Sequence, residues 1–468
     1  MALKLSKGNW ADVKKMQQEK TLQDLTQIIS QKNPELFSGN AIASDQYDMA
    51  YEIVKTAVWS NEDLPVFEKE NYTKLIMGQA AGYGPLLPFF IGEFLGPDGE
   101  MYSSTEITEV MVNPRPNKPP IVFYGWHGRQ WPADEVYFKD NIEVKNFIQK
   151  TCEDSGRSFN EENAIADAWL ADGSRLAAFG FKVNPIGPAF TIRKSPLLRP
   201  AMPLDKLASF GMFPHLVKEM IIDLLIAGHA NIGFFGRTDS GKTTVVRACG
   251  EFFDPIERVL IGETSFELSF PHLLNCLNLV EVGFGDHKII TMDDICDALN
   301  RNNPDRSIVG EIRGKEIIAA SEIAETTSGG FITTGHAGDI DDLRSRFPKM
   351  FYRGGMELKR EHVDGQLATM FHFLLFFDKP QGTVGEDGKI TEGKRTLMSL
   401  VEVKKDGNHE TIIQFDFDEY AASRRKIRRW IYNKPISSTR LGYISFHGGD
   451  VQPEYERVTE KYLYPEEE

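Results

Sequence analysis

The stretch Gly236–Thr244 reads Gly-Arg-Thr-Asp-Ser-Gly-Lys-Thr-Thr, and its spacing decides the fold expected for the carboxy-terminal half of the chain. It fits G-x-x-x-x-G-K-[ST], the loop that cradles phosphates between a strand and a helix. The apolar run Asn231–Phe235 precedes the loop, and we expect a helix to begin at Lys242. Glycines let successive backbone N–H groups curl toward phosphate, and the helix amino terminus adds its positive dipole end. The stretch therefore predicts a site for ATP with magnesium.

Two residues of this loop have the most specific expected roles. Lys242 should reach the β- and γ-phosphates, and the Thr243 hydroxyl should ligate magnesium. Asp239 departs from the usual pattern, because its position often holds glycine; its charge could weaken binding, or it could turn outward and pair with Arg237 or Lys242. The residues expected to bind the nucleotide are Gly236, Arg237, Thr238, Asp239, Ser240, Gly241, Lys242, Thr243 and Thr244.

Beyond residue 204, short apolar runs alternate with helix-like segments, which predicts an α/β domain with a mostly parallel, doubly wound sheet. The expected strands are Asn231–Phe235, Arg258–Gly262, Asn278–Val282, Ser307–Val309, Gly330–Thr334 and Phe371–Phe377. Helices are expected at Asp293–Asn300 and Lys315–Thr326, and a hairpin from Thr396–Val403 and Glu410–Phe417.

Acidic and basic residues follow several of these strands, at the edge where open α/β sheets bind ligands. Glu311 ends the run Ser307–Glu311 and is expected to act on magnesium or its bound water. Glu263 and Glu267 follow another strand, and either could polarise an attacking water. His336 comes after a third strand, where a structural role and a functional one are about equally expected.

Length and composition bound the rest. The 468 residues predict two or three domains, and 41% apolar with 26% charged residues is ordinary for a folded, soluble protein. Apolar stretches fall short of the roughly 20 residues that span a bilayer, and the amino terminus does not resemble a secretory signal, so we expect a cytoplasmic chain. Four cysteines without a C-x-x-C pair indicate neither a disulfide framework nor a zinc cluster.

Charge argues against general nucleic-acid binding, because the net charge is −15. The run Arg424–Trp430 is a local exception that could meet anionic lipid, nucleic acid or an acidic partner. A solvated helix face, or one that pairs with acidic residues of a neighbouring subunit, is the simpler interpretation.

The chain is expected to divide into five parts. We predict a helical amino-terminal extension over 1–71, a smaller α+β domain over 72–194 and a proline-rich linker over 195–203. The nucleotide-binding domain should cover 204–418, followed by a carboxy-terminal extension over 419–468.

Taken in order, these motifs resemble the secretion ATPase superfamily of type II and type IV secretion, conjugation, and type IV and tight-adherence pilus assembly. Its four boxes are similar to Gly236–Thr244 (Walker A), Glu263–Leu268 (Asp box), Ile308–Gly314 (Walker B) and Thr334–Ala337 (His box). Stretches of the preceding domain, such as Asp172–Arg175 and Phe190–Lys194, also look like the family's amino-terminal domain. The similarity covers about residues 83–417 and is strongest to the tight-adherence and conjugation branch.

The resemblance implies a RecA-like ATPase domain, a PAS-like domain before it, and a homo-hexameric ring that works at the cytoplasmic face of a membrane. It makes Glu311 the Walker B acid and a magnesium ligand together with Thr243, and His336 a γ-phosphate sensor. The implied catalytic residues are Glu311, Glu267, Glu263, His336, Arg301 and Arg313, and Arg175 and Arg193 would reach the nucleotide from the preceding domain. An inner-membrane platform protein is the implied partner, peripheral membrane association is allowed, and nucleic acid is not expected to bind directly.

Three departures limit the resemblance. The Asp box, Gly-Glu-Thr-Ser-Phe-Glu-Leu, is one residue longer than usual, only Arg301 remains of an arginine pair before Pro304-Asp305, and Asp239 replaces glycine. They leave two alternatives to an ATP-hydrolysing motor for secretion, conjugation or pilus assembly. One is a nucleotide-gated scaffold with little hydrolysis, and the other is a nucleic-acid-stimulated motor of the same fold.

Overall fold

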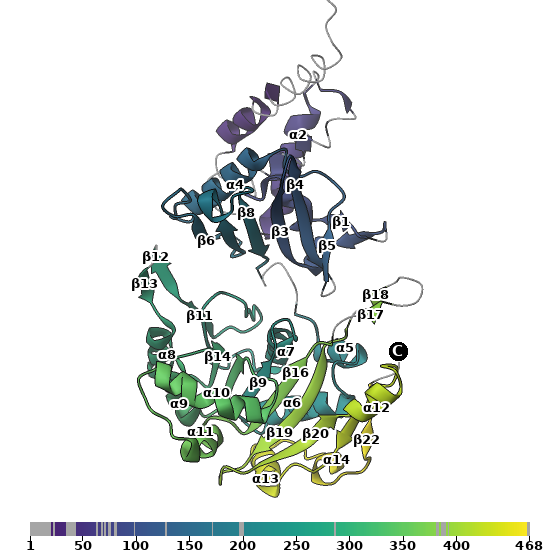
Figure 1. Cartoon of the computed structure of the whole chain (residues 1–468), viewed down its shortest axis with the longest axis vertical. Coiled ribbons are helices and arrows are strands. Elements are labelled where there is room, and N and C mark those ends of the chain that lie inside the picture. Colours follow the sequence, from purple (N-terminus) through teal and green to yellow (C-terminus); the bar gives the residue numbers. More distant parts are fainter. Residues whose placement is uncertain are drawn as a thin grey trace, which may run out of the picture. The chain divides into compact units, whose positions relative to one another are not determined.

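The computed structural model of the chain divides into two compact units, Met1–Pro200 and Ala201–Glu468 (Figure 1). It describes residues 82–465 apart from 98, 127–128, 171, 196–200, 285–286, 381–382, 385–389 and 392. Before residue 82 it describes 20–21, 24–33, 44–61, 64–66, 69, 72–73 and 76–78. Each unit has hydrophobic core of its own.

The first unit is built on an antiparallel sheet whose strands lie in the order β5-β4-β3-β8-β7-β6. The strands are β3 (Ile107–Arg115), β4 (Lys118–Trp126), β5 (Arg129–Pro132), β6 (Ile165–Trp169), β7 (Arg175–Phe179) and β8 (Ala189–Arg193). A short pair, β1 (Glu93–Leu95) and β2 (Met101–Ser103), comes before them. Burial alternates along β6 and β7, as expected for an antiparallel sheet with one covered face.

Helical residues cover that face. Helix α4 (Asn141–Asp154) buries Val144, Ile148 and Cys152 against inward-facing strand residues such as Val110 and Ile192. The same cluster contains residues from the described part of 1–71, which is helical over 24–32 and over α2 (Ser44–Trp59). These residues are Leu25, Ile29, Ala50, Val54 and Val58. The amino-terminal helices therefore share a core with the α+β domain.

The second unit is built on a larger, mixed sheet. Within the described residues, ten strands lie in the order β11-β10-β14-β15-β9-β16-β19-β20-β21-β22. The parallel part consists of β11 (Cys276–Val280), β10 (Val259–Glu263), β14 (Arg306–Ile312), β15 (Phe331–Gly335), β9 (Ile232–Gly236) and β16 (Phe373–Asp378). The mostly parallel α/β sheet predicted from the alternating runs is confirmed.

Helices cover both faces of this sheet, which is why its central strands are apolar throughout. Phe234 and Leu375 pack with one set of helices, whereas the adjacent Phe235 and Leu374 pack with the other. The first set is α5 (Leu204–Ser209), α6 (His215–Ile226) and α7 (Lys242–Cys249). The second set is α8 (Met292–Arg301), α9 (Ile317–Thr326), α10 (Ile340–Arg353) and α11 (Val363–Met370).

The antiparallel part of the sheet extends to the carboxy-terminal residues. The expected hairpin forms from β19 (Thr396–Val403) and β20 (His409–Phe415), and β19 pairs with β16. Beyond Asp418, the chain adds β21 (Trp430–Tyr432) and β22 (Tyr462–Leu463) to the same layer (Figure 1). The Trp430 side chain is completely buried, and its indole Nε1 donates to Leu397 O at 2.8 Å. The segment expected as an extension is thus continuous with the sheet.

Trp430 provides a test of this continuity. We expect Trp430→Ala to lower the free energy of unfolding of the second unit by about 3–5 kcal/mol, because it empties a large core site and leaves a buried acceptor without its donor. Urea unfolding followed by circular dichroism measures the loss. Phe446→Ala is the control, because Phe446 is 82% exposed. Equal effects of the two changes would contradict a core role for β21.

Candidate functional site

The parallel pairing places the carboxyl ends of five neighbouring strands along one edge of the second unit's sheet. In spatial order these are β10, β14, β15, β9 and β16. Gly335 lies opposite Phe235, and Phe377 lies opposite Gly236, so β15 and β16 end at the level of the loop that follows β9. Glu263 is the last residue of β10, and Glu311 lies near the end of β14. Glu267, His336 and the Walker A loop lie where the chain leaves β10, β15 and β9. Most of the predicted site residues are therefore neighbours along this edge.

Two glycines let the Walker A loop run close to its surroundings. A Cβ atom on Gly236 would collide with Phe377 O and lie 2.6 Å from Ser240 Oγ. A Cβ on Gly241 would lie 2.8 Å from Met212 Cε and 2.9 Å from Arg395 Cδ. Gly241 has φ +93° and immediately precedes α7, so the left-handed turn leads directly into the helix. The loop therefore has the backbone path expected of a phosphate cradle.

Lys242 is folded back onto this loop. Its Nζ donates to Gly236 O and to Arg237 O, at 2.9 Å each. Burial lowers the pKa of Lys242, and the carboxylates of Glu311 and Glu267 act against that shift. The ammonium group is thus held by neutral carbonyl groups within an acidic surrounding.

The Walker B strand changes course just before its acid. The pairing of β14 with β15 shifts register between Val309 and Ile312, and Glu311 lies in this irregular segment. Its carboxylate pairs with the Arg313 guanidinium and with His336 Nε2, which is 2.9 Å from Glu311 Oε1. Burial raises the pKa of Glu311, but hydrogen bonds from His336 and Arg313 outweigh it and bring the pKa to about 2. Glu311 is therefore a carboxylate over the whole physiological pH range.

His336 connects this acid to the Walker A loop. Its Nδ1 lies 3.1 Å from Gly236 O, while its Nε2 contacts Glu311. His336 therefore lies between the Walker A loop and the Walker B acid and contacts both.

The two Asp-box carboxylates occupy different environments. Glu263 is only 4% exposed, and its carboxylate accepts the backbone N–H groups of Glu267 and Leu268 at 3.1–3.3 Å. Burial raises the pKa of Glu263 to about 8, against the lowering effect of these hydrogen bonds. Glu267 is half-buried, and its charge raises the pKa of Arg313. Glu263 thus stabilises the loop that follows β10 by accepting from its backbone. Glu267 is the Asp-box acid that interacts electrostatically with Lys242 and Arg313.

Arg301 does not join this group. It is the exposed last residue of α8, and the next residue, Asn302, accepts from Arg258 Nε at the start of β10. That position is at the amino ends of the strands, because α8 runs back along the sheet from its carboxyl edge. The expectation that Arg301 acts at this chain's nucleotide site is therefore not met by the fold.

The arginines expected from the preceding domain lie in the first unit. Arg175 and Arg193 are directly opposite each other in the β7–β8 pair, and Arg175 forms an ion pair with Asp167 at 3.2 Å. Their approach to a nucleotide stays a prediction.

Asp239 pairs with residues that the sequence did not suggest. Its carboxylate contacts Lys379 Nζ at 2.9 Å and the Arg395 guanidinium, rather than Arg237 or Lys242. Arg237 instead lies 3.9 Å from Asp378. Lys379 follows β16 and Arg395 precedes β19, and only the pairing of β16 with β9 brings them to the loop. The sequence offered one signal, a lysine two residues after the apolar run Phe371–Phe377.

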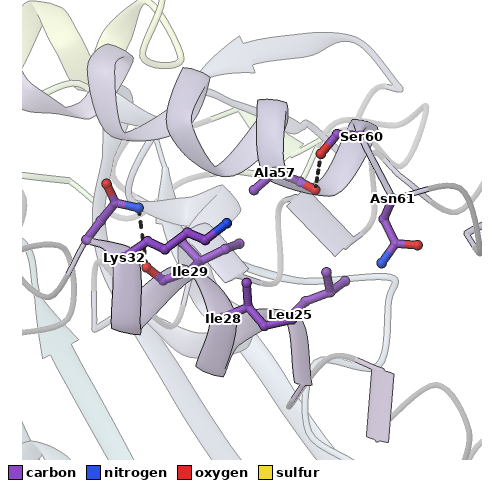
Figure 2. Close-up of a pocket in the computed structure, with 8 residues that line it drawn as sticks. Leu25, Ile28, Ile29, Lys32, Ala57, Ser60 and Asn61 are labelled. Atoms are coloured by element: carbon purple, nitrogen blue, oxygen red, sulfur yellow. Dashed lines mark hydrogen bonds between the residues drawn. The ribbon is translucent and has the colours of Figure 1, made fainter.

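A separate hollow lies among the amino-terminal helices of the first unit. Figure 2 shows it between Leu25, Ile28 and Ile29 on one side and Ala57, Ser60 and Asn61 on the other, with Lys32 at its rim. Its volume of about 210 Å³ is smaller than that of common ligand pockets, about 300–1,000 Å³. It contains none of the Walker or box residues.

Comparison with known proteins gives this site a family. Residues 142–361 match the family described as type II/IV secretion system protein. The uncharacterized protein MJ0900 of Methanocaldococcus jannaschii is 30% identical over 212 residues, which are 45% of this chain and 38% of that protein. The type IV secretion system protein VirB11 of Brucella suis is 25% identical over 288 residues, or 55% of this chain and 77% of VirB11.

Among solved structures, the Legionella pneumophila ATPase DotB is similar, with a TM-score of 0.43 and 17% identity over 65% of this chain and 79% of DotB. The chain spans 38% and 29% of the first two curated relatives that it matches. Over residues 142–361, which contain the site, the chain is similar to the type II/IV secretion system protein family.

The raised pKa of Glu263 can be tested through the pH dependence of the free energy of unfolding. Glu263 has a pKa of about 8 in the folded chain and an ordinary value of 4.5, so the folded state binds the extra proton between these values. Its contribution to stability is complete below pH 4.5 and is lost as the pH rises through 8. We expect Glu263→Gln to remove this part of the pH dependence, on the order of a few kcal/mol.

Thermal or urea unfolding from pH 5 to 9 measures the effect. Glu325→Gln, an exposed glutamate of α9, is the matched control and should keep the wild-type slope. An unchanged slope for Glu263→Gln would contradict the raised pKa.

Proposed function

We propose that this chain is an ATP-hydrolysing motor that drives secretion, conjugation or pilus assembly. The observation that carries the proposal is the meeting of the Walker A loop, Glu311, His336 and Glu267 at one edge of the sheet. Phosphoryl transfer needs positioning and charge stabilisation more than covalent chemistry, and this edge offers both.

The loop fits the phosphates of a nucleotide. Its two glycines leave space that a Cβ would fill, and the Ser240 hydroxyl is buried with no hydrogen-bond partner among the described residues. Lys242 Nζ donates to two backbone carbonyl groups, those of Gly236 and Arg237. We propose that Lys242 exchanges these carbonyls for β- and γ-phosphate oxygens, which are stronger partners because they are charged.

Magnesium would complete the site through Thr243 and Glu311. Mg²⁺ is held mainly by phosphate oxygens, waters and one or two protein oxygens, so a hydroxyl and a carboxylate suffice. When bound, it neutralises charge on the phosphates. Glu311 is ionised, as this role requires, and its contacts with Arg313 and His336 fix its direction.

Glu267 is the residue we propose to orient the attacking water. Glu267 is half-buried near Lys242 and Arg313, whereas the Glu263 carboxylate is bonded to the backbone of the loop after β10. His336 then reports on the γ-phosphate, because it touches both the Walker A carbonyl and Glu311.

The wider assembly is part of the same proposal. We propose a RecA-like domain for residues 204–418, a PAS-like domain for 72–194, and a ring of six copies. In it, Arg175 and Arg193 would approach the nucleotide on closure, which couples hydrolysis to motion. An inner-membrane platform protein would be the partner, reached from the cytoplasm. None of the described helices is long and apolar enough to span a bilayer.

A nucleotide-gated scaffold is the second candidate, because one of the two Asp-box acids is unavailable. Glu263 is buried with a raised pKa and is bonded to the backbone, so only Glu267 can act on water. Direct nucleic-acid binding is less well supported. In the basic run, Arg429 pairs with Asp416 and Glu419, and Trp430 is in the core.

Phosphate release by the purified chain separates a motor from a scaffold. We expect Lys242→Ala to lose ATP binding and turnover, and Glu311→Gln to keep binding while its turnover falls about 10²-fold or more. Glu361→Gln is the control, since its side chain is 70% exposed and lies outside the site. Wild-type turnover equal to that of Lys242→Ala, with ATP still bound, would favour the scaffold.

A further inference from the structure

Asp239, Lys379 and Arg395 form a cluster of charges beside the Walker A loop that the proposed reaction has not used. Lys379 Nζ is 2.9 Å from Asp239 Oδ2. Arg395 contacts Asp239 twice: its Nε donates to the backbone oxygen at 3.0 Å, and its guanidinium pairs with the carboxylate. We call these three residues the P-loop clamp.

The sheet explains why these residues meet although they are far apart in sequence. Strand β16 runs parallel to β9 and ends beside Gly236, so Lys379 emerges at the loop. Strand β19 runs antiparallel to β16, with Thr396 opposite Asp378, so Arg395 enters at the same edge. The Arg395 side chain then lies against Gly241, where an added Cβ would be 2.9 Å from Arg395 Cδ.

The basic run of the carboxy-terminal segment supports the clamp from behind. Arg428 Nη2 donates to Arg395 O at 3.4 Å and to the Thr396 hydroxyl. Its guanidinium also lies 5.9 Å from the centre of the Trp430 ring, and Trp430 is buried. Arg428 thus anchors the backbone of Arg395 to the core, which gives part of the basic run a position in the structure.

Asp239 has a backbone conformation that suits few residues. Its φ is +62°, in the left-handed region that glycine adopts freely and that aspartate tolerates better than most residues. Burial raises the pKa of Asp239, but Arg395 and Lys379 outweigh it, so the carboxylate is charged. Asp239 also acts electrostatically on Lys242. An unpaired carboxylate here would therefore repel the phosphates that Lys242 is placed to bind.

We propose that Arg395 and Lys379 are positioning residues for the nucleotide, which act by neutralising Asp239 and holding its side chain toward β16 and β19. The proposal rests on nucleotide binding at the Walker A loop. The two cations offset the carboxylate, so that the loop presents its N–H groups and Lys242 to the triphosphate without a competing negative charge. Their effect on ATP affinity is carried through Asp239, and it disappears when Asp239 is uncharged.

A double-mutant cycle tests this dependence. The dissociation constant of Mg-ATP is measured by isothermal titration calorimetry on the purified full chain for wild type, Arg395→Gln, Asp239→Asn and the double variant. We expect Arg395→Gln to weaken binding about tenfold, since it leaves a partly buried charge underpaired. Asp239→Asn should bind at least as tightly as wild type, and the double variant should lie within about threefold of Asp239→Asn.

Controls separate this result from simpler effects. Lys426→Gln removes one exposed positive charge from the same unit, and it should leave affinity within about twofold of wild type. Lys379→Gln should repeat the loss seen for Arg395→Gln, again relieved by Asp239→Asn. Far-ultraviolet circular dichroism of each variant checks that the chain is folded.

The contradictory outcomes are distinct. An equal loss from Arg395→Gln in both backgrounds would mean that Arg395 meets the nucleotide directly, and no loss in either would mean that the pair is irrelevant; both overturn the clamp alone. Wild type binding no better than Lys242→Ala would overturn the proposed function, and the clamp with it.

Discussion

The parallel pairing of β9 with β15 and β16 is the constraint on which the rest of the second unit depends. It fixes the ends of three strands at one level, so that His336, the Walker A loop and Lys379 become neighbours although up to 143 residues separate them in sequence. The helices on both faces bury the central strands, which makes a change of register costly, because every side chain would exchange one face for the other. The geometry of the site is therefore a property of the core.

Two glutamates at this edge, Glu311 and Glu263, lie in opposite electrostatic environments and therefore have different roles. Burial raises the pKa of Glu311, but the contacts with His336 and Arg313 outweigh it and bring the pKa to about 2, so the carboxylate is ionised. Glu263 lies at the end of β10, next to the Walker B strand β14. Burial raises its pKa to about 8, and its carboxylate accepts hydrogen bonds from backbone N–H groups. One acid can serve a metal or water, whereas the other stabilises a loop. The same balance allows Asp239 in a phosphate-binding loop, because two cations accompany it.

Local patterns in the sequence were sufficient for the strands, the helix at Lys242 and the group formed by Glu311, His336 and the Walker A loop. These features depend on short spacing and on strands ending at a common edge. Features that depend on distant pairing were not predictable in this way. Asp239 finds partners 140 and 156 residues later, the irregular pairing redirects Glu311, and α8 carries Arg301 to the opposite edge. The carboxy-terminal strands were missed because Trp430–Tyr432 is short and follows a strongly basic run.

The central claim is that the Walker A loop of the second unit binds the phosphates of ATP, with Lys242 changing partners as it does so. A structure determined with magnesium and a non-hydrolysable ATP analogue tests it most directly. The account predicts phosphates against the loop, with Lys242 Nζ moved from Gly236 O and Arg237 O, now 2.9 Å away, to β- and γ-phosphate oxygens. At saturating analogue, Lys242 still bonded to both carbonyls, with the phosphates elsewhere or absent, would contradict it.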